Sequence, residues 1–316
     1  MGEGTIGPDG LVQMAHVAHR HYVEGRTRIE IAEELGVSRF KVGRLLDEAA
    51  RAGVVRFVIS TPGPLDLELS LELRRRFGLR RALAVRTPTE NPETVQEHLG
   101  RSAAELLEEI ATEDDVVGLT AGRTLTAVAR SLRQLPGCEV VQLAGVAGPI
   151  QETGVEVIRR VSTVAGGTPW SIYAPLVVSD AATARALRRQ NDVQRTYEQF
   201  GRVTLALVAV GSWNPPDSQM YDNAAITPEA RSRLLASGAV AEVCSTVLDA
   251  DGRVLPDIED RCIAVSTEQL RKIPEVIAVA GGSKKTAAVR AALASGLVTS
   301  LVTDAALARR LLGASE

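Results

Sequence analysis

Residues 28–46 read RIEIAEELGVSRFKVGRLL and carry the spacing of a helix-turn-helix over residues 29–46. The small residue Ala32 stands four places before Gly36, which lets two helices pack closely. Glycine takes without strain the turn conformation that other residues adopt only at a cost. Ser38 is a good N-cap for the helix after the turn. The stretch therefore predicts two short helices joined by a tight turn.

The second of these helices has an apolar face and a basic face. The apolar face, expected to pack inward, consists of Val42, Leu45, Leu46 and Ala49. In a recognition helix an arginine reads a guanine edge, an aromatic ring touches a thymine methyl group, and neighbouring cations hold phosphates. The residues that we expect to contact DNA are Ser38, Arg39, Phe40, Lys41 and Arg44.

The alternative is a helical hairpin whose charged face is only solvated. The serine cap and the basic front of the second helix favour DNA binding instead. Residues 1–60 hold eight Lys or Arg against eight Asp or Glu, and the whole chain has a formal net charge of −3. Because phosphate neutralisation supplies most non-specific affinity, one copy is expected to bind DNA weakly. We therefore expect a homodimer or homotetramer on double-stranded operator DNA.

The composition indicates an α/β core. Apolar residues make up 45% of the 316 residues and aromatic residues only 3%, so Leu, Val, Ile and Ala must fill the interior. The cysteines Cys138, Cys244 and Cys262 are widely spaced and form no CxxC pair, which is typical of reduced core residues. The first residues, MGEGTIGPDG, lack the basic-then-apolar order of a signal peptide, and no apolar run approaches the roughly 18 residues of a membrane span. We expect a cytoplasmic protein without membrane attachment, metal or cofactor.

The chain divides at residues 61–64, where TPGP forms a stiff break. Residues 1–60 are expected to be the DNA-binding domain, with a first helix ending near Gly25 and a strand or wing over residues 52–60. Residues 65–316 are expected to be a separate effector-binding and oligomerisation domain. The predicted class is α/β, with a small winged helix-turn-helix followed by a Rossmann-like domain.

Short apolar strands alternate with helices in the second domain, which predicts a mostly parallel sheet with helices on both faces. Ligands then bind at the carboxyl ends of the strands. The expected strands cover residues 81–85, 116–119, 139–143, 171–174, 203–210, 276–279 and 299–302. The expected helices cover residues 65–77, 93–110, 124–132, 155–165, 181–189, 228–236, 286–294 and 305–312.

Two strand–turn–helix junctions, TAGRT at residues 120–124 and GGSKK at residues 281–285, have the composition of a phosphate site. Small-residue loops that enter a helix expose backbone N–H groups and the positive end of the helix dipole. The hydroxyls of Thr124 and Ser283 and the ammonium of Lys285 would add hydrogen bonds. Neither loop is a Walker A or GxGxxG motif, and small residues also serve ordinary tight turns. Together the two loops favour a phosphorylated small molecule as ligand.

Several motifs resemble the SorC family of bacterial sugar-responsive regulators, across about residues 11–313. They are the helix-turn-helix, GLTAGRTLTAVA, YAPLVV, SGAVAEVCSTVLDADGRVL and VIAVAGGSKKTAAVRAALASGLVTSLVTDAALARRLL. The resemblance implies a domain similar to sugar-phosphate isomerases, a phosphorylated sugar or polyol effector, and dimers or tetramers on operators. It implies as effector-binding residues Gly122, Arg123, Thr124, Glu242, Gly282, Ser283 and Lys285.

The same resemblance places further acidic and amide residues near the site. Asp249 and Asp304 stand at family-typical positions, and Asp304 is expected to be a helix cap rather than a ligand. The more variable stretches offer as further candidates Gln151, Glu156, Trp213 and Gln219.

Two other functions remain open. One is a sugar-phosphate isomerase or deaminase, for which Glu242, Asp222 and Asp249 are candidate bases and a Schiff base through Lys285 or Lys284 is conceivable. No histidine follows His98, which argues against a ring-opening imidazole. The other is a regulator whose effector carries no phosphate.

Overall fold

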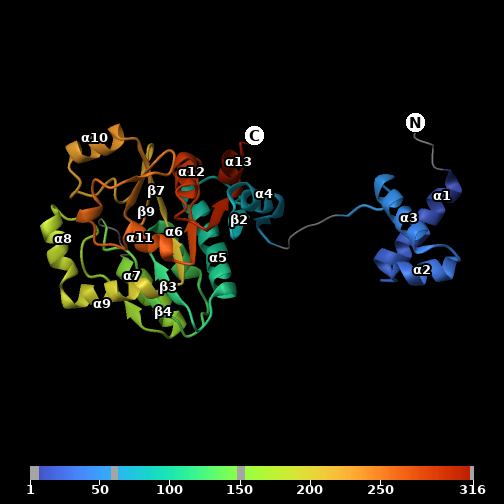
Figure 1. The fold of residues 1–316 in the computed structure, drawn as a ribbon, viewed down its shortest axis with the longest axis horizontal. Helices are drawn as coiled ribbons and strands as arrows, with labels where there is room; N and C mark the ends of the chain where they lie inside the picture. The colour runs from blue at the N-terminus through green and yellow to red at the C-terminus, as the bar shows by residue number, and fades with distance from the viewer. Residues whose placement is uncertain (1–6, 58–62, 148–153, 314–316) are drawn as a thin grey trace. The chain divides into compact units, whose positions relative to one another are not determined.

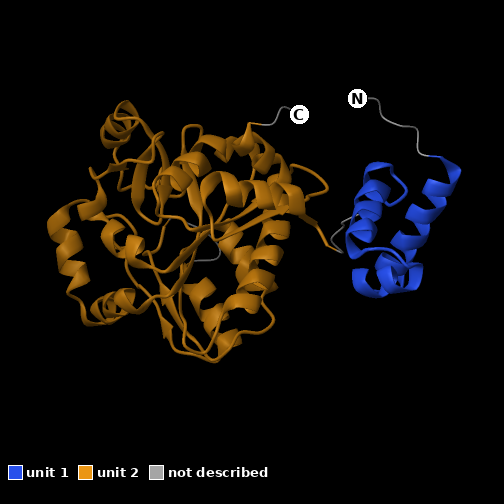
Figure 2. Ribbon diagram, turned by 45° about the vertical axis from the view of Figure 1, so that its right-hand side comes forward, with its two compact units in different colours: residues 1–60 blue, residues 61–316 orange. Residues whose placement is uncertain are grey.

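The computed structural model describes residues 7–57, 63–147 and 154–313. The chain forms two compact units, residues 1–60 and residues 61–316, shown in different colours in Figure 2. Each unit has a hydrophobic core of its own and is described by itself.

The first unit is a small helical bundle. Its helices are α1 (Pro8–Ala18), which continues as the π-helical turn η1 (His19–Val23), α2 (Arg28–Leu35) and α3 (Arg39–Arg51). Thr27 forms a capping box with Glu30 at the start of α2, and Gly36 ends that helix in the left-handed conformation with φ 61°. The core is made by Met14, Val17, Ala18, Ile31, Ala32, Val42, Leu46 and Ala49.

The strand or wing expected over residues 52–60 is wrong for its described part. Residues 52–57 form no strand, and residues 58–60 lie outside the described residues. Val54 and Val55 instead pack against the helical core, and the Val55 N–H donates to the Ala49 carbonyl. The β-branched side chains predicted a strand, but a strand needs a partner, and the described part of this unit provides none.

The second unit is built on an eight-stranded sheet with the order β1-β2-β13-β12-β6-β3-β4-β5. Every neighbouring pair is parallel except β1 and β2. From β3 the chain adds β4 and β5 on one side, and from β6 it adds β12 and β13 on the other, so the order reverses between β3 and β6. The strands are β1 (Leu65–Asp66), β2 (Arg81–Val85), β3 (Val116–Leu119), β4 (Glu139–Gln142), β5 (Pro169–Trp170), β6 (Leu205–Val208), β12 (Glu275–Val279) and β13 (Ser300–Asp304).

Helices cover both faces of this sheet (Figure 1), as expected for buried parallel strands. Along β6, Leu205 and Leu207 belong to one core, whereas Ala206 and Val208 belong to the other, because side chains alternate along a strand. The first core is closed by α5 (Pro92–Ile110), α6 (Arg123–Ser131) and α7 (Gly154–Ala165). The second core is closed mainly by α4 (Leu67–Phe77), α9 (Asn191–Gln199), α12 (Thr286–Ala294) and α13 (Ala305–Leu312).

A second, antiparallel sheet was not expected. Its strand order is β11-β10-β9-β7-β8. Its strands are β7 (Val210–Trp213), β8 (Pro216–Asp217), β9 (Ala239–Val243), β10 (Thr246–Asp249) and β11 (Val254–Leu255). The helices α8 (Ala181–Arg188), α10 (Pro228–Ala236) and α11 (Thr267–Lys272) complete the unit.

Two strand predictions were wrong for reasons of hydrogen bonding. The apolar run 203–210 is split at Ala209, whose N–H donates to the Thr120 hydroxyl at 3.1 Å instead of continuing one strand. Residues 171–174 form no strand, because the Ile172 N–H donates to the Gln142 side chain at 3.0 Å. Among the described helices none is long and apolar enough to cross a membrane.

Candidate functional site

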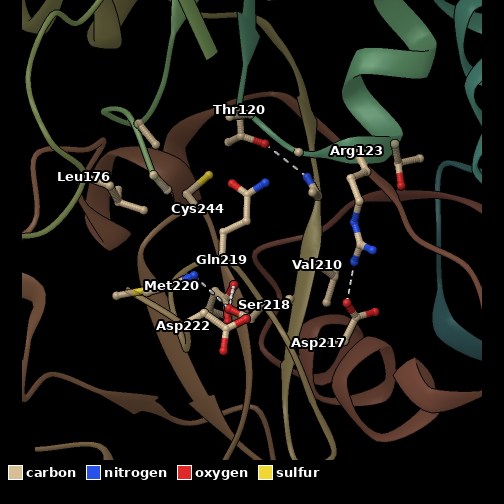
Figure 3. A pocket seen from close by; sticks show the side chains of 18 of the residues that line it. Thr120, Arg123, Leu176, Val210, Asp217, Ser218, Gln219, Met220, Asp222 and Cys244 are labelled. Carbon is tan, nitrogen blue, oxygen red and sulfur yellow. Dashed lines mark hydrogen bonds and ion pairs between the residues drawn. The ribbon is translucent and has the colours of Figure 1, made fainter. Parts of the chain in front are cut away.

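A cavity of about 480 Å³ opens where the strand order reverses. This is the place where open α/β sheets bind ligands, because the loops after the two diverging strands separate there. The residues after β3 and β6 line one side of the cavity, and β7, β9 and the segment 216–222 line another (Figure 3). Its polar lining consists of Gln96, Thr120, Arg123, Thr124, Asp217, Ser218, Gln219, Asp222, Glu242 and Lys285.

The loop after β3 presents the start of α6 to this cavity. Gly122 is the N-cap of α6 with φ 145°, a conformation that L side chains rarely adopt. No side chain caps this helix among the described residues, so the first-turn N–H groups of Arg123 and Thr124 remain available. Three of the expected effector-binding residues, Gly122, Arg123 and Thr124, therefore lie together at a helix N-terminus.

Two cations flank the same region. The Arg123 guanidinium donates to the Asp217 carboxylate at 2.5 Å, and Figure 3 shows this pair beside Val210. The Lys285 ammonium donates to the Val210 carbonyl at 2.7 Å and lies 3.7 Å from the other Asp217 oxygen. Burial lowers the pKa of Lys285, and the Asp217 and Glu242 carboxylates oppose that shift. The cavity thus holds a largely buried lysine whose ammonium lies beside the Asp217 carboxylate.

Glu242 provides a buried carboxyl group in the cavity lining. It receives hydrogen bonds from the Trp213 indole and, at 2.6 Å, from the Ser218 hydroxyl. Burial raises its pKa to about 7. Gly211 stands opposite it on β7, and a Cβ there would lie 1.8 Å from a Glu242 carboxyl oxygen. Only glycine at this position leaves the space that the carboxyl group fills.

The second of the two predicted phosphate loops, residues 281–285, contributes fewer residues to the cavity than we expected. Lys285 lines the cavity, but Gly282 and Ser283 do not. The Gly282 N–H is already used, because it donates to the Asp304 carboxylate at 2.7 Å. The other Asp304 oxygen accepts from the Leu307 N–H at 2.8 Å and caps α13, so the expectation that Asp304 is a structural cap is confirmed.

The remaining candidates separate into those near the cavity and those away from it. Gln219 and Asp222 line it, and Trp213 lies behind Glu242. Glu156 pairs instead with Arg159 on the exposed side of α7. Asp249 holds the turn after β10 by accepting from backbone N–H groups. Gln151 lies outside the described residues.

Sequence reasoning missed several residues of the cavity, among them Gln96, Asp217, Ser218 and Cys244. Gln96 lies in the middle of α5, where helical periodicity does not distinguish it. Asp217 and Ser218 follow two prolines and look like ordinary turn residues. Cys244, expected as a core residue, is only half-buried, and desolvation raises its pKa to about 12, so the thiol stays protonated. In the described part of the chain no group of His, Cys, Asp or Glu is arranged to hold a metal ion.

The candidate DNA-binding surface lies on α3. The Ser38 hydroxyl accepts from the Lys41 N–H at 3.2 Å and caps this helix. Val42 and Leu46 are buried, and Arg39, Lys41 and Arg44 are exposed on the other side. Phe40 is 71% exposed, and the Arg39 guanidinium lies 5.0 Å from its ring centroid. The second helix of the helix-turn-helix thus presents an exposed aromatic ring and three cations in its N-terminal half, the part of a recognition helix that contacts base edges.

Fold and site together define a two-unit regulator, with a helix-turn-helix in one unit and a sugar-sized cavity in the other. Residues 64–313 match the family model "Putative sugar-binding domain". The chain is 30% identical over 300 residues to the "Deoxyribonucleoside regulator" of Bacillus subtilis, covering 93% of this chain and 95% of that protein. It is 30% identical over 305 residues to the "Transcriptional regulator LsrR" of Klebsiella pneumoniae, covering 95% and 92%.

The fold agrees with the crystal structure of the full-length sorbitol operon regulator SorC of Klebsiella pneumoniae. The TM-score is 0.73 at 22% identity, covering 96% of this chain and 99% of that one. The chain belongs to the SorC family of sugar-binding transcriptional regulators. The expected family and the expected α/β fold class are thus confirmed.

Proposed function

We propose that this regulator binds a phosphorylated sugar or polyol in the cavity between β3 and β6 and thereby controls its binding to operator DNA. One observation carries the proposal. The uncapped first turn of α6 opens into a cavity that also contains Arg123 and Lys285. Backbone N–H groups, a helix dipole and two cations together are the groups that recognise a phosphate monoester.

The rest of the cavity suits the sugar. Glu242, Gln219 and Asp222 supply oxygen acceptors for hydroxyl groups, and Gln219 also supplies donors. Relatives support this ligand class, because their names include a deoxyribonucleoside regulator and a sorbitol operon regulator. The phosphate-binding residues of our proposal are Gly122, Arg123, Thr124 and Lys285, without Gly282 and Ser283.

Residues 1–60 are proposed as the DNA-binding domain and the rest of the chain as the effector and oligomerisation domain. Ser38, Arg39, Phe40, Lys41 and Arg44 would contact the operator, with Lys41 and Arg39 on phosphates and Arg44 on a base. A balanced charge in residues 1–60 makes one copy a weak binder, so a homodimer or homotetramer supplies the affinity. Effector binding then changes the spacing of the two recognition helices, and the half-sites no longer fit.

The effector assignment is tested by thermal unfolding with sugar phosphates and the matching unphosphorylated sugars. A ligand at 100 times its dissociation constant adds about 2.7 kcal/mol, which is a readily measured rise in Tm. We expect Lys285→Ala to abolish the rise with sugar phosphates. Lys284→Ala is the matched control, because Lys284 is exposed and does not line the cavity. Equal responses of the two variants would contradict the phosphate assignment.

We further propose that the bound sugar phosphate is not converted. Glu242, with a pKa near 7, is the group best suited to proton transfer. Its two oxygens, however, already accept hydrogen bonds from Trp213 and Ser218. Incubating each stabilising ligand with the protein and searching for product by NMR tests this point. Product formation that disappears in Glu242→Gln would establish an enzyme instead.

A further inference from the structure

One carboxylate of the chain itself, that of Asp217, lies beside both cations of the proposed phosphate site. Asp217 accepts from Arg123 through one oxygen and lies 3.7 Å from the Lys285 ammonium through the other. Asp217 comes from β8, a two-residue strand at the edge of the antiparallel sheet, whereas Arg123 begins α6. An ion pair thus joins the edge of the antiparallel sheet to the start of α6, at the place where the effector phosphate is expected.

A phosphate monoester offers these cations more than Asp217 does. It carries about −1.5 to −2 charges at pH 7 and three acceptor oxygens, against one charge and two oxygens for a carboxylate. Among the described residues no side chain accepts from the first-turn N–H groups of α6, so Asp217 leaves those donors unused. A phosphate in the same place can bind the cations and the N–H groups together.

Asp217 can also leave at moderate cost. Its side chain is 31% exposed, and Arg123 is 58% exposed, so the carboxylate regains water when the pair separates. Lys285 is only 17% exposed and needs an anion beside it. A neutral sugar cannot replace that anion, because it would leave the Lys285 ammonium with only the Glu242 carboxyl group, whose pKa is about 7, as an acidic neighbour.

We propose that Asp217 is an internal competitor of the effector phosphate, so that the effector binds by displacing this carboxylate from Arg123 and Lys285. The inference rests on the proposed phosphate site. It makes Asp217 the residue that excludes neutral sugars and sets the effector concentration at which the regulator responds. The next residue, Ser218, donates to Glu242. Displacement of Asp217 therefore reaches the sugar end of the cavity through segment 216–222.

The experiment measures the affinity of the full-length protein for inorganic phosphate by calorimetry at one salt concentration. Asp217→Asn keeps the size of the side chain and removes its charge. We expect this variant to bind phosphate about tenfold more tightly, a factor that corresponds to about 1.4 kcal/mol. Glu93→Gln is the control, because Glu93 is an exposed carboxylate one turn before Gln96 on α5 and does not line the cavity. It should change the affinity less than threefold.

Three outcomes overturn the inference. Unchanged or weaker phosphate binding by Asp217→Asn would mean that Asp217 positions Arg123 for the ligand instead of competing with it. Equal tightening by Asp217→Asn and Glu93→Gln would reduce the effect to the general charge around the cavity. Phosphate binding that is undetectable in the wild type and in Asp217→Asn would overturn both this inference and the phosphate site.

Lys285→Ala separates the two proposals. If the wild type binds phosphate and Lys285→Ala does not, the phosphate site stands whatever Asp217→Asn does. Folding of every variant is checked by its thermal unfolding. Asp217→Ser serves as a second substitution that also removes the charge, and it must tighten phosphate binding as well.

Discussion

Glu242 is a buried acidic residue, with 7% of its surface exposed. Burial raises its pKa from 4.5 to about 7, although hydrogen bonds from Ser218 and Trp213 and the charge of Lys285 all act in the opposite direction. Desolvation therefore outweighs three favourable partners. Such a residue is kept at a cost in stability, which is typical of a group that serves a ligand.

This cost predicts a pH-dependent difference between the wild type and Glu242→Gln. The folded protein keeps the Glu242 proton at pH values where the unfolded chain has released it. Between about pH 4.5 and 7 the group therefore makes the free energy of unfolding fall as the pH rises. Glutamine does not titrate, so relative to the wild type the variant should gain on the order of 2 kcal/mol between pH 5 and pH 8.

Urea unfolding followed by tryptophan fluorescence measures this gain. Both tryptophans, Trp170 and Trp213, lie in residues 61–316, the same compact unit as Glu242, so the signal reports on the unfolding of that unit. Glu113→Gln, at an exposed turn before β3, is the control and should show no such trend. A difference between wild type and Glu242→Gln that stays constant with pH would show that the Glu242 pKa is not raised in the folded protein.

Helix α3 has a structural face and, in our proposal, a DNA-recognition face. Val42, Leu46 and Ala49 recur at helical spacing and are buried, so the opposite side is left for contacts with other molecules. Asp47 is exposed and Glu48 half-buried further along the helix, and their charges repel DNA phosphates. DNA contact is therefore confined to the N-terminal half of α3 in our proposal.

We expect Arg44→Ala to weaken operator binding by about 5- to 150-fold and to relax the preference for one base pair, because one bidentate contact to guanine discriminates by about 1–3 kcal/mol. Arg51→Ala, at the last and exposed residue of the same helix, should change the affinity less than twofold. Fluorescence anisotropy with a DNA site selected by the wild-type protein, at fixed salt, measures both. Equal losses in the two variants would place the DNA contact elsewhere.

At the scale of the whole molecule, effector and operator must influence each other equally. If the sugar phosphate lowers operator affinity by some factor, operator DNA lowers effector affinity by the same factor, because the coupling free energy is shared. We expect a factor of about 5 to 150, the usual range for such coupling. Calorimetry of the effector with and without saturating operator measures it. Equal effector affinities would contradict a switch that acts through DNA release.

Local features of the sequence predicted most of the helices. Residues 228–236, 286–294 and 305–312 are helical with the expected bounds. Caps such as Ser38 and Asp304, together with apolar spacing, act over only a few residues, so neighbouring positions contain the whole signal. The location of the cavity at the carboxyl ends of the strands also followed from the alternation of strands and helices.

Only the tertiary structure shows that a second sheet forms and which residues line the cavity. Asp217 forms an ion pair with Arg123, although the two residues are 94 positions apart in the sequence. Gly211, on the strand beside that of Glu242, leaves the space for the Glu242 carboxyl group. The Gly282 N–H looked free in the sequence, yet Asp304, which follows 22 positions later, accepts its hydrogen bond.

The helix-turn-helix, the two loops and the family could be read from the sequence, because each depends on residues that lie close together along the chain. Which loop lines the cavity, and which carboxylate lies beside its cations, depended on strand order. Hydrogen bonds and ion pairs between distant segments form only after the sheets assemble, and no local pattern encodes them.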